Sequence, residues 1–288
     1  MAYTRKDVST LTAAERRRFV KALLEIKRRG EYDEFVRMHI DHYVSDGDGG
    51  LRSAHMAPSF LPWHRRFLLD LERALRRVDP SVTVPYWDWT RDRSTNAAPW
   101  TKDFLGGNGR RSDHQVTTGP FAYSTGQWTI RENVTDGKFL TRDLGRAAAP
   151  IALPTGSDVE RALQDPVYDT APWDSTATRG FRNKLEGWGT GSGSAAWRNH
   201  NRVHRWVGGV MLGGASVNDP VFWLHHAFID LLWTRWQTRH REHRYLPAAA
   251  PGPRDRQYRR VVARQEKLPP WDVTPAQLED VSRIYRYA

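Results

Sequence analysis

Apolar residues recur at helical spacing in three stretches near the start of the chain. The first follows a capping-box pattern, Thr-Ala-Ala-Glu from Thr12, and ends at Gly30. The second covers 31–43, and the third covers 65–78, where an Asp-Pro pair follows. We therefore predict three consecutive helices in this part of the chain.

The middle of the chain has a different pattern. SVTVPYWDW, at 81–89, is a short extended apolar run, and the remainder of 81–180 is interrupted repeatedly by Gly and Pro. Helical spacing is visible at 157–164, at 197–207 and again at 226–241, after which we expect loops up to the C-terminus. The predicted fold class is mainly α: a central four-helix bundle with loop-rich insertions and a few short strands.

The domain organisation follows from length and pattern. A chain of 288 residues is long enough for one large domain or two small ones. It contains no internal repeat and no low-complexity linker, and its strongest helical patterns lie near opposite ends. We expect these helices to pack together, so residues 1–288 are predicted to form a single domain.

Composition and charge narrow the chemistry. The chain has no cysteine, which excludes disulfides, thiolate nucleophiles, iron–sulfur clusters and zinc fingers. Any metal must therefore be held by His, Asp or Glu. The net charge is +11, but the basic residues are scattered among acidic ones and no nucleic-acid motif is present. We expect a basic, solvated surface and no nucleic-acid partner.

Membrane and export signals are absent from the pattern. Mean hydropathy is −0.70, and no uninterrupted apolar stretch approaches the ~18 residues of a membrane span. Residues 1–19 include basic side chains but lack the apolar core of a secretory signal. We predict no membrane association and no signal peptide of the chain's own.

The 11 histidines carry the strongest chemical signal. Eight of them fall into two groups that are far apart in sequence: His39, His42, His55 and His64, and His200, His204, His225 and His226. His200 and His204 are four residues apart on a predicted helix, so their imidazoles share one face within reach of one metal ion. His226 opens the next predicted helix and can complete a three-imidazole set.

The first group allows a similar set. His39 lies on a predicted helix, His55 in the following loop and His64 at the start of the next helix. Two antiparallel helix pairs would then supply two three-histidine sets, an arrangement used for metal sites inside bundles. A lone histidine is more often a hydrogen-bonded core residue. Here both sets are flanked by Trp and Phe, where unpaired imidazoles are costly to bury.

The ligand type suggests the metal. Paired zinc or manganese sites usually include bridging carboxylates, which are few near these histidines. All-imidazole ligation suits copper, and two metal ions about 3.5–4 Å apart can hold a small ligand between them. For copper, we expect that ligand to be dioxygen.

Five motifs resemble those of a known family. SFLPWHRRF, PYWDW, LEGW, NHNRVH and NDPVFWLHHAFID occur in the expected order between about Thr10 and Trp271. They resemble the type 3 binuclear copper proteins, and specifically the small bacterial tyrosinases of the actinobacterial kind. The family also includes catechol oxidases, o-aminophenol oxidases and the oxygen-carrying hemocyanins. Tyrosinases of this group lack the Cys–His thioether of fungal and plant relatives, which agrees with the absence of cysteine.

The resemblance implies a ligand set for two copper ions. Copper A is held by His39, His55 and His64, and copper B by His200, His204 and His226. His225 resembles the family's non-ligand histidine beside the site and is grouped with the substrate-binding residues. His42 has no matching histidine in the relatives considered.

The resemblance also implies a catalytic pair. Glu186, in LEGW, and Asn201 are expected to hold a water near the metals. A phenol must lose its proton before it coordinates copper, and a carboxylate-held water could accept it. The chain departs from the family between Glu186 and His200, where the Gly/Ser-rich segment from Gly189 to Ala196 is longer than expected and would lie beside the mouth of the site.

Further roles are implied around the metals. Phe60 is expected to pack on a copper A imidazole, and Asp219 and Asp230 to fix the backbone or the orientation of a histidine. Arg205 would face the entrance and orient substrates that carry a carboxylate. Ser216 matches the small residue over copper A that leaves room for an aromatic ring.

By resemblance, the chain ortho-hydroxylates a monophenol such as tyrosine and oxidises the o-diphenol to an o-quinone. It uses two copper ions and O2 as co-substrate, as in melanin formation. Two alternatives stay open: a catechol or o-aminophenol oxidase with little monophenol hydroxylation and, more remotely, an oxygen-binding protein like hemocyanin. Related bacterial enzymes commonly work with a small copper-delivering (caddie-type) companion that carries the export signal. The chain is therefore expected in the cytoplasm or exported with such a partner.

Overall fold

The computed structural model describes residues 2–189 and 197–288. The helices and strands, in chain order, are β1 (Tyr3–Arg5), η1 (Val8–Thr10), α1 (Ala13–Arg28), α2 (Glu31–His42), α3 (Phe60–Val78), η2 (Ala98–Trp100), η3 (Tyr123–Thr125), α4 (Gly156–Leu163), α5 (Phe181–Glu186), α6 (Asn199–Val207), η5 (Gly209–Leu212), η6 (Gly214–Asn218), α7 (Val221–Arg239), η7 (Pro275–Leu278) and β2 (Tyr285–Tyr287). The mainly helical class that the sequence predicts is confirmed.

The first helix begins as predicted. The Thr12 hydroxyl accepts the N–H of Glu15, and the Glu15 carboxylate accepts the N–H of Thr12 at 2.8 Å, so the capping box is present. Gly30 separates α1 from α2 with a φ of 80°, a left-handed conformation that glycine adopts without strain. The two helices therefore follow each other almost without a loop.

The third helix begins earlier than predicted, at Phe60 rather than at 65. Pro62 does not prevent this start, because it lies in the first turn, where backbone N–H groups have no partner inside the helix. Trp63 and His64 consequently lie on α3 itself.

The last long helix also begins early, at Val221 rather than at 226. α7 is buried on nearly all sides, so no polar face marks its first turn in the sequence. His225 and His226 therefore lie within the helix rather than at its start. The short helix α5 was not predicted, because its 6 residues are too few to show a periodicity.

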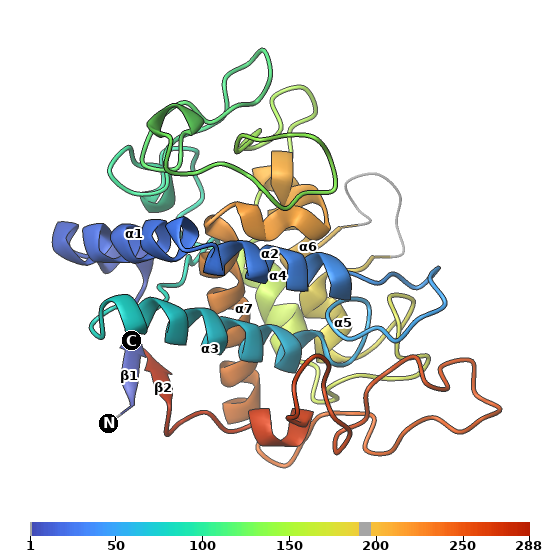
Figure 1. The fold of residues 1–288 in the computed structure, drawn as a ribbon. Helices are drawn as coiled ribbons and strands as arrows, with labels where there is room; N and C mark the ends of the chain where they lie inside the picture. The colour runs from blue at the N-terminus through green and yellow to red at the C-terminus, as the bar shows by residue number, and fades with distance from the viewer. Residues whose placement is uncertain (1, 190–196) are drawn as a thin grey trace.

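The helices that carry the histidines pack on one another. α2 and α3 lie side by side and run in opposite directions, and α7 crosses behind them (Figure 1). Phe35 of α2 lies 5.7 Å from Phe67 of α3 between ring centroids, and Phe67 lies 4.7 Å from Trp223 of α7. One continuous cluster of buried apolar side chains runs through all of these helices.

Tryptophans fasten the loops to this core. The indole N–H of Trp63 donates to the carbonyl oxygen of Pro269 at 2.9 Å, and that of Trp236 donates to Asp165 at 2.7 Å. Each ring thus buries apolar surface and also satisfies a carbonyl of a distant loop. The loop-rich segments are in this way held against the helices.

The two short strands bring the chain ends together. β1 and β2 pair in parallel, with Tyr3 opposite Tyr285, and both ends lie on the same side of the molecule (Figure 1). The extended run expected at 81–89 forms no strand in the described chain. It contributes a single bridge between Tyr86 and Asp7.

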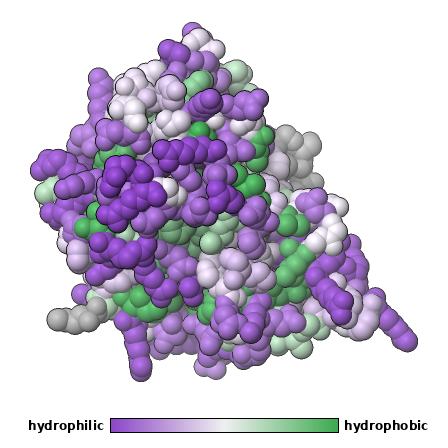
Figure 2. Space-filling model, in the orientation of Figure 1, coloured by the Kyte–Doolittle hydropathy of each residue, from purple (hydrophilic) through white to green (hydrophobic). Residues whose placement is uncertain are grey.

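The surface is mostly polar on the face seen in Figure 2, where hydrophobic residues appear only in small separate patches. Among the residues that the structure describes, no helix has both the length and the apolar character that crossing a membrane requires.

Candidate metal centre

Two groups of histidines converge in the interior. Within each group, the nitrogen atoms that could bind a metal lie within 4.8 Å of one another: His39, His55 and His64 in the first, and His200, His204, His225 and His226 in the second. They come from α2, the loop before α3, α3 itself, α6 and α7. The fold thus brings together all six histidines expected to bind copper, three in each group.

The second group has its nitrogen atoms turned toward one point. The Nε2 atom of His226 lies 3.3 Å from that of His200 and 3.4 Å from that of His204. The Nδ1 atom of His200 lies 2.9 Å from Asn201 Oδ1, and that of His204 lies 2.7 Å from the carbonyl oxygen of Met211. These acceptors place the ring proton on Nδ1, which leaves a lone pair on Nε2. The lone pairs of His200 and His204 thus both face the Nε2 atom of His226, an arrangement suited to hold a metal ion.

The first group shows the same tautomer logic. The Nδ1 atom of His39 lies 2.6 Å from the carbonyl oxygen of Gly214, and that of His64 lies 2.9 Å from that of Phe60. The Nε2 atoms of His39 and His64 are buried and have no hydrogen-bond partner among the described residues. The His55 ring lies 5.0 Å from each of the other two between centroids. Three buried imidazoles thus converge, with Nε2 atoms of His39 and His64 that no group of the described protein satisfies.

The two groups face a common space. The rings of His64 and His226 are stacked at 4.2 Å between centroids. Phe60 lies between the groups, 4.9 Å from the ring of His64 and 4.8 Å from that of His200. Phe60 therefore contacts one imidazole of each group.

Two further histidines lie nearby in different roles. The Nδ1 atom of His225 accepts the indole N–H of Trp89 at 3.1 Å, which places the proton of the neutral ring on Nε2. Its ring stacks on that of His200 at 5.0 Å and 16°. The Nδ1 atom of His42 lies 2.9 Å from the carbonyl oxygen of Met38, and its ring lies 5.7 Å from that of Trp63 between centroids, outside the first group.

Burial keeps the converging imidazoles neutral. It is the largest cause that lowers the pKa of His39 from 6.5 to about 3 and that of His204 to about 4. The carbonyl groups of Gly214 and Met211 oppose these shifts. Burial, together with neighbouring imidazoles, also lowers the pKa values of the other four well below the usual value: His55, His64, His200 and His226. Neutral rings at physiological pH are what metal ligation requires.

Glu186 lies against the first group. Its Oε1 atom accepts the N–H of Met56, the residue after His55, at 2.7 Å, and its Oε2 atom accepts from Arg182 at 2.8 Å. Burial raises the pKa of Glu186, and the Arg182 guanidinium opposes that rise. A buried carboxylate of raised pKa beside the site is suited to accept a proton.

Asn201 lies against the second group. Its Oδ1 atom fixes the tautomer of His200, and its Nδ2 atom is buried with no partner in the described part of the chain. Asn201 also lines a cavity of about 280 Å³ that includes His55, His200 and His204 in its wall. An open N–H donor in that cavity can bind a water or a substrate oxygen.

Part of the cavity wall is aromatic and cationic. Trp188 and Trp197 form an antiparallel bridge, with ring centroids 5.1 Å apart, and the guanidinium of Arg205 lies 4.7 Å from the Trp197 ring. Both tryptophans, Arg205 and the fully buried Ser216 line the cavity. The Gly/Ser-rich segment singled out in the sequence lies, at 190–196, outside the described residues.

The two aspartates expected around the metals hold backbone and arginines. Asp219 accepts two hydrogen bonds from Arg142 at 2.7 Å and one from the N–H of Val221 at 3.0 Å, where α7 begins. Asp230 accepts from Arg65 at 2.5 Å, and Arg65 is the residue after His64. Both carboxylates therefore act on the helices that carry the histidines, and neither has a histidine partner among the described residues.

Sequence reasoning missed part of the cavity wall. The Tyr43 ring lies 4.7 Å from that of His55, and Tyr43 lines the cavity with Met56 and the two tryptophans. Tyr43 could have been found, because it lies four residues after His39 and thus on the same helix face. Trp197 was expected at the start of the helix predicted over 197–207, but α6 begins at Asn199, and Trp197 instead lies in the cavity wall.

Comparison with known proteins places this site in a family. Residues 29–239 match the family model described as the common central domain of tyrosinase. The chain is 52% identical to a tyrosinase of Streptomyces glaucescens over 284 residues, which is 98% of each protein. It is 41% identical to grixazone synthase of Streptomyces griseus over 318 residues, covering 100% of this chain and 99% of that protein. The structure of a polyphenol oxidase from Thermothelomyces thermophila is similar in fold, with a TM-score of 0.62 and 24% identity over 82% of this chain and 70% of that one.

A helical fold around two facing three-histidine groups defines a type 3 dinuclear copper protein. More particularly, the chain belongs to the tyrosinase family, and it is an enzyme. Proteins of this family use two copper ions and O2, and the donor set fits that pair. The donors are neutral imidazole nitrogens only, which suit copper, and unpartnered Nε2 atoms of His39 and His64 point into the centre of their group.

Proposed function

We propose that this enzyme ortho-hydroxylates a monophenol and oxidises the resulting o-diphenol to the o-quinone. Overall, one monophenol and one O2 give one o-quinone and one water, so atoms and electrons balance. The observation that carries this proposal is the placement of the buried Glu186 carboxylate beside a cavity whose wall contains imidazoles of both groups. When bound, the copper pair supplies the redox chemistry between the phenol and O2.

We assign the ligands of copper A and copper B as the resemblance implies: His39, His55 and His64, and His200, His204 and His226. The choice of His226 over His225 is supported by the tautomers, because the Nδ1 lone pair of His225 is already occupied by the indole N–H of Trp89. Because the ligands come from both ends of one continuous core, we also propose that 1–288 acts as a single domain.

Proton transfer is assigned to Glu186 and Asn201. The phenol must lose its proton to bind as phenolate, and Glu186 takes that proton, directly or through a water held with Asn201 Nδ2. The raised pKa of Glu186 and the unpartnered Nδ2 of Asn201 support these roles.

Substrate orientation is assigned to three residues around the cavity. Arg205, held on the Trp197 ring, offers a charge to a substrate carboxylate. Ser216 is small and buried in the cavity wall, so an aromatic ring fits beside it. The His225 ring supports His200 from behind, against which the substrate would stack.

The test combines metal content with substrate choice. We expect two copper ions per chain and a near-UV band after hydrogen peroxide is added. Turnover of tyrosine, DOPA and an o-aminophenol is then compared, with the lag on tyrosine analysed. Two copper ions with no tyrosine hydroxylation would replace the proposal by a catechol or o-aminophenol oxidase. Reversible O2 binding without turnover would replace it by an oxygen carrier.

A copper-delivering companion is a separate proposal. All six ligand histidines are largely buried, so a donor that presents copper at the cavity would speed loading. We propose a small partner protein of this kind, which would also account for export if the enzyme leaves the cytoplasm. Full copper loading and normal secretion of this chain expressed alone would contradict it.

A further inference from the structure

We propose that Arg52 is a positioning residue for copper A. Its buried guanidinium holds the loop that carries His55 and, through Met56, keeps Glu186 beside that loop. The inference rests on the proposed function, because it takes His55 as a copper ligand.

His55 differs from the other assigned ligands in how its ring is held. The others lie on α2, α3, α6 or α7, whose backbone hydrogen bonds fix them, whereas His55 lies in the irregular segment between α2 and α3. Its Nδ1 atom, like that of His226 but unlike that of His39 or His64, has no hydrogen-bond partner among the described residues. The His55 ring packs against those of Tyr43, His39 and His64, and its backbone, which lies outside any helix, must be held by other contacts.

Arg52 supplies that hold from three residues away. Its Nη1 atom donates to the carbonyl oxygen of Met56 at 2.7 Å and also to the carboxylate of Asp46. Its backbone N–H donates to the carbonyl oxygen of Arg260 at 2.9 Å. The Arg52 side chain, which is 1% exposed, thus ties the residue after His55 to a point well before it. The loop from Asp46 to Met56, which contains His55, is thereby closed at both of its ends by Arg52.

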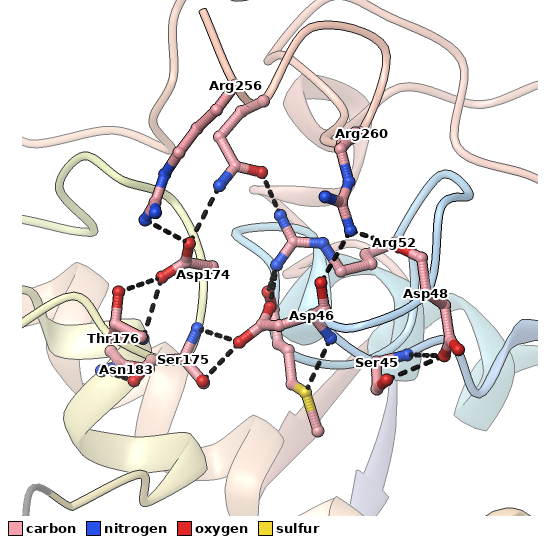
Figure 3. A network of polar contacts seen from close by, with 12 residues as sticks. Ser45, Asp46, Asp48, Arg52, Asp174, Ser175, Thr176, Asn183, Arg256 and Arg260 are labelled. Atoms are coloured by element: carbon pink, nitrogen blue, oxygen red, sulfur yellow. Dashed lines mark hydrogen bonds and ion pairs between the residues drawn. The ribbon is translucent and has the colours of Figure 1, made fainter.

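The far side of the guanidinium is anchored to the C-terminal part of the chain. The Nη2 atom of Arg52 donates to the side-chain oxygen of Gln257, whose Nε2 atom donates to Asp174 at 2.9 Å. Arg260 donates to the carbonyl oxygen of Asp46 at 2.8 Å. Figure 3 shows Arg52 at the middle of this network, between Asp46 and the segment that carries Arg260.

The same network reaches α5, which ends in Glu186. The second carboxylate oxygen of Asp46 accepts the N–H of Ser175 at 3.1 Å, and the carbonyl oxygen of Ser175 accepts from Asn183 of α5 at 3.2 Å. On the other side, Met56 has a φ of 51° and donates its N–H to Glu186. A residue other than glycine adopts that φ only when its surroundings hold it there. Arg52 bonds the carbonyl of this same residue.

The chemistry requires arginine at this position. The planar guanidinium donates in several fixed directions at once, here to Asp46, Met56 and Gln257, whereas a lysine ammonium on a flexible stem cannot match that fork. Loss of residues that orient a metal ligand typically lowers metal affinity by about 10–100-fold. We expect that loss at copper A and not at copper B.

The experiment measures copper(I) binding against a competing chelator rather than turnover. Arg52→Lys is made in two backgrounds, His204→Ala, which retains copper A, and His55→Ala, which retains copper B. In the His204→Ala background, Arg52→Lys should weaken binding of the remaining copper about 10-fold or more. In the His55→Ala background it should change binding less than about twofold.

Arg264→Lys is the matched control. Arg264 is also an arginine with a carboxylate partner, but it is only partly buried and donates to Glu279 at 2.6 Å, in the C-terminal part of the chain. It should lower the melting temperature and leave copper affinity unchanged in both backgrounds. If Arg52→Lys does not fold, Gln257→Leu, which removes one acceptor of the guanidinium, should show a smaller effect with the same site preference.

The outcomes separate this inference from the proposed function. Equal weakening of both copper ions, or no weakening of copper A, overturns the role of Arg52. If the unmodified chain does not bind two copper ions, the proposed function fails instead, before the variants are compared.

Discussion

The two metal-binding groups are similar in their ligands but differ in how the chain builds them. Every assigned ligand of copper B lies on a helix, His200 and His204 one turn apart on α6 and His226 on α7. Among the assigned ligands of copper A, His39 and His64 lie on helices, whereas His55 lies in the loop that contains Arg52 and its hydrogen-bond partners. Backbone hydrogen bonds within helices therefore position the assigned copper B ligands, whereas a network of side-chain hydrogen bonds also helps to position those of copper A.

The comparison shows what each design depends on. A helix fixes ligand spacing through repeated local bonds, so single side-chain changes around copper B disturb it little. The loop depends on a few long-range contacts between segments around 46, 174 and 257, and the loss of any one of these contacts would disturb it. Substitutions nearby, and removal of the metal, should therefore disturb the protein around the assigned copper A ligands more than that around the copper B ligands.

The largest effect is expected from removing one ligand on each side. His204→Ala and His55→Ala should each reduce the copper content from two ions to one and reduce turnover to background, because neither copper works alone. Copper binding should also slow amide hydrogen exchange more in residues 45–56 than in α6. The backbone hydrogen bonds of α6 persist without metal, whereas the loop at 45–56 has few of its own. Metal analysis and exchange of the loaded and metal-free protein check both. Equal changes in the two regions would remove the distinction.

The same contrast explains how far sequence reasoning reached. The HxxxH spacing of His200 and His204 predicted their shared face, because a helix turns local sequence into known geometry. The Thr12 capping box was predicted for the same reason. The role of Arg52 was not predictable, because its partners lie at 46, 56 and 257 and no local rule connects those positions.

The start of α7 and part of the cavity wall also could not be predicted from local sequence. α7 was predicted late because burial on all sides removes the polar stripe that would reveal its first turn. Trp197 lies in the cavity wall, where it bridges to Trp188 across a Gly/Ser-rich segment of the sequence. Nothing local in the sequence indicates such a contact.

The second prediction concerns acidification of the metal-free protein. Burial lowers the pKa of His39 from 6.5 to about 3 and that of His204 from 6.5 to about 4. At a pH between the lowered pKa and 6.5, each of these histidines therefore binds more protons in the unfolded state than in the folded state. Stability is therefore present in full above about pH 6.5 and is lost as the pH falls toward 4 and then 3, by up to about 1.4 kcal/mol per pH unit for each such group. Melting curves of the metal-free protein from pH 7.5 to 4.5 measure it.

Two variants separate the sites in that measurement. His39→Gln and His204→Gln each remove one such imidazole, so each should flatten the dependence of the melting temperature on pH. A slope that stays the same in both variants would show that other groups dominate acid unfolding.

The third prediction tests proton transfer at the copper A side. Glu186→Gln keeps an oxygen to accept the N–H of Met56 but cannot take a proton from the phenol. We expect hydroxylation of tyrosine to fall by about 10²–10⁴-fold, and oxidation of DOPA to fall less, because an o-diphenol loses its protons more readily. Initial rates on both substrates, at full copper content, give the ratio. An equal fall on both substrates would make Glu186 a positioning group only.

The smallest effect is expected at the entrance on the copper B side. Arg205 follows His204 on α6, is partly exposed and rests on the Trp197 ring, so its attraction for a substrate carboxylate is weakened by solvent. Arg205→Gln should raise the KM for 4-hydroxyphenylpropionate by about two- to fivefold, a size typical of exposed charge pairs, and should leave that for neutral 4-methylphenol unchanged. Trp197→Leu should produce part of the same change, because it removes the ring that holds the guanidinium. Since both residues lie outside the ligand sets, copper content should stay at two ions per chain. A loss of copper A in either variant would show that the His55 loop is coupled to α6. Such coupling would weaken the distinction between the two sites.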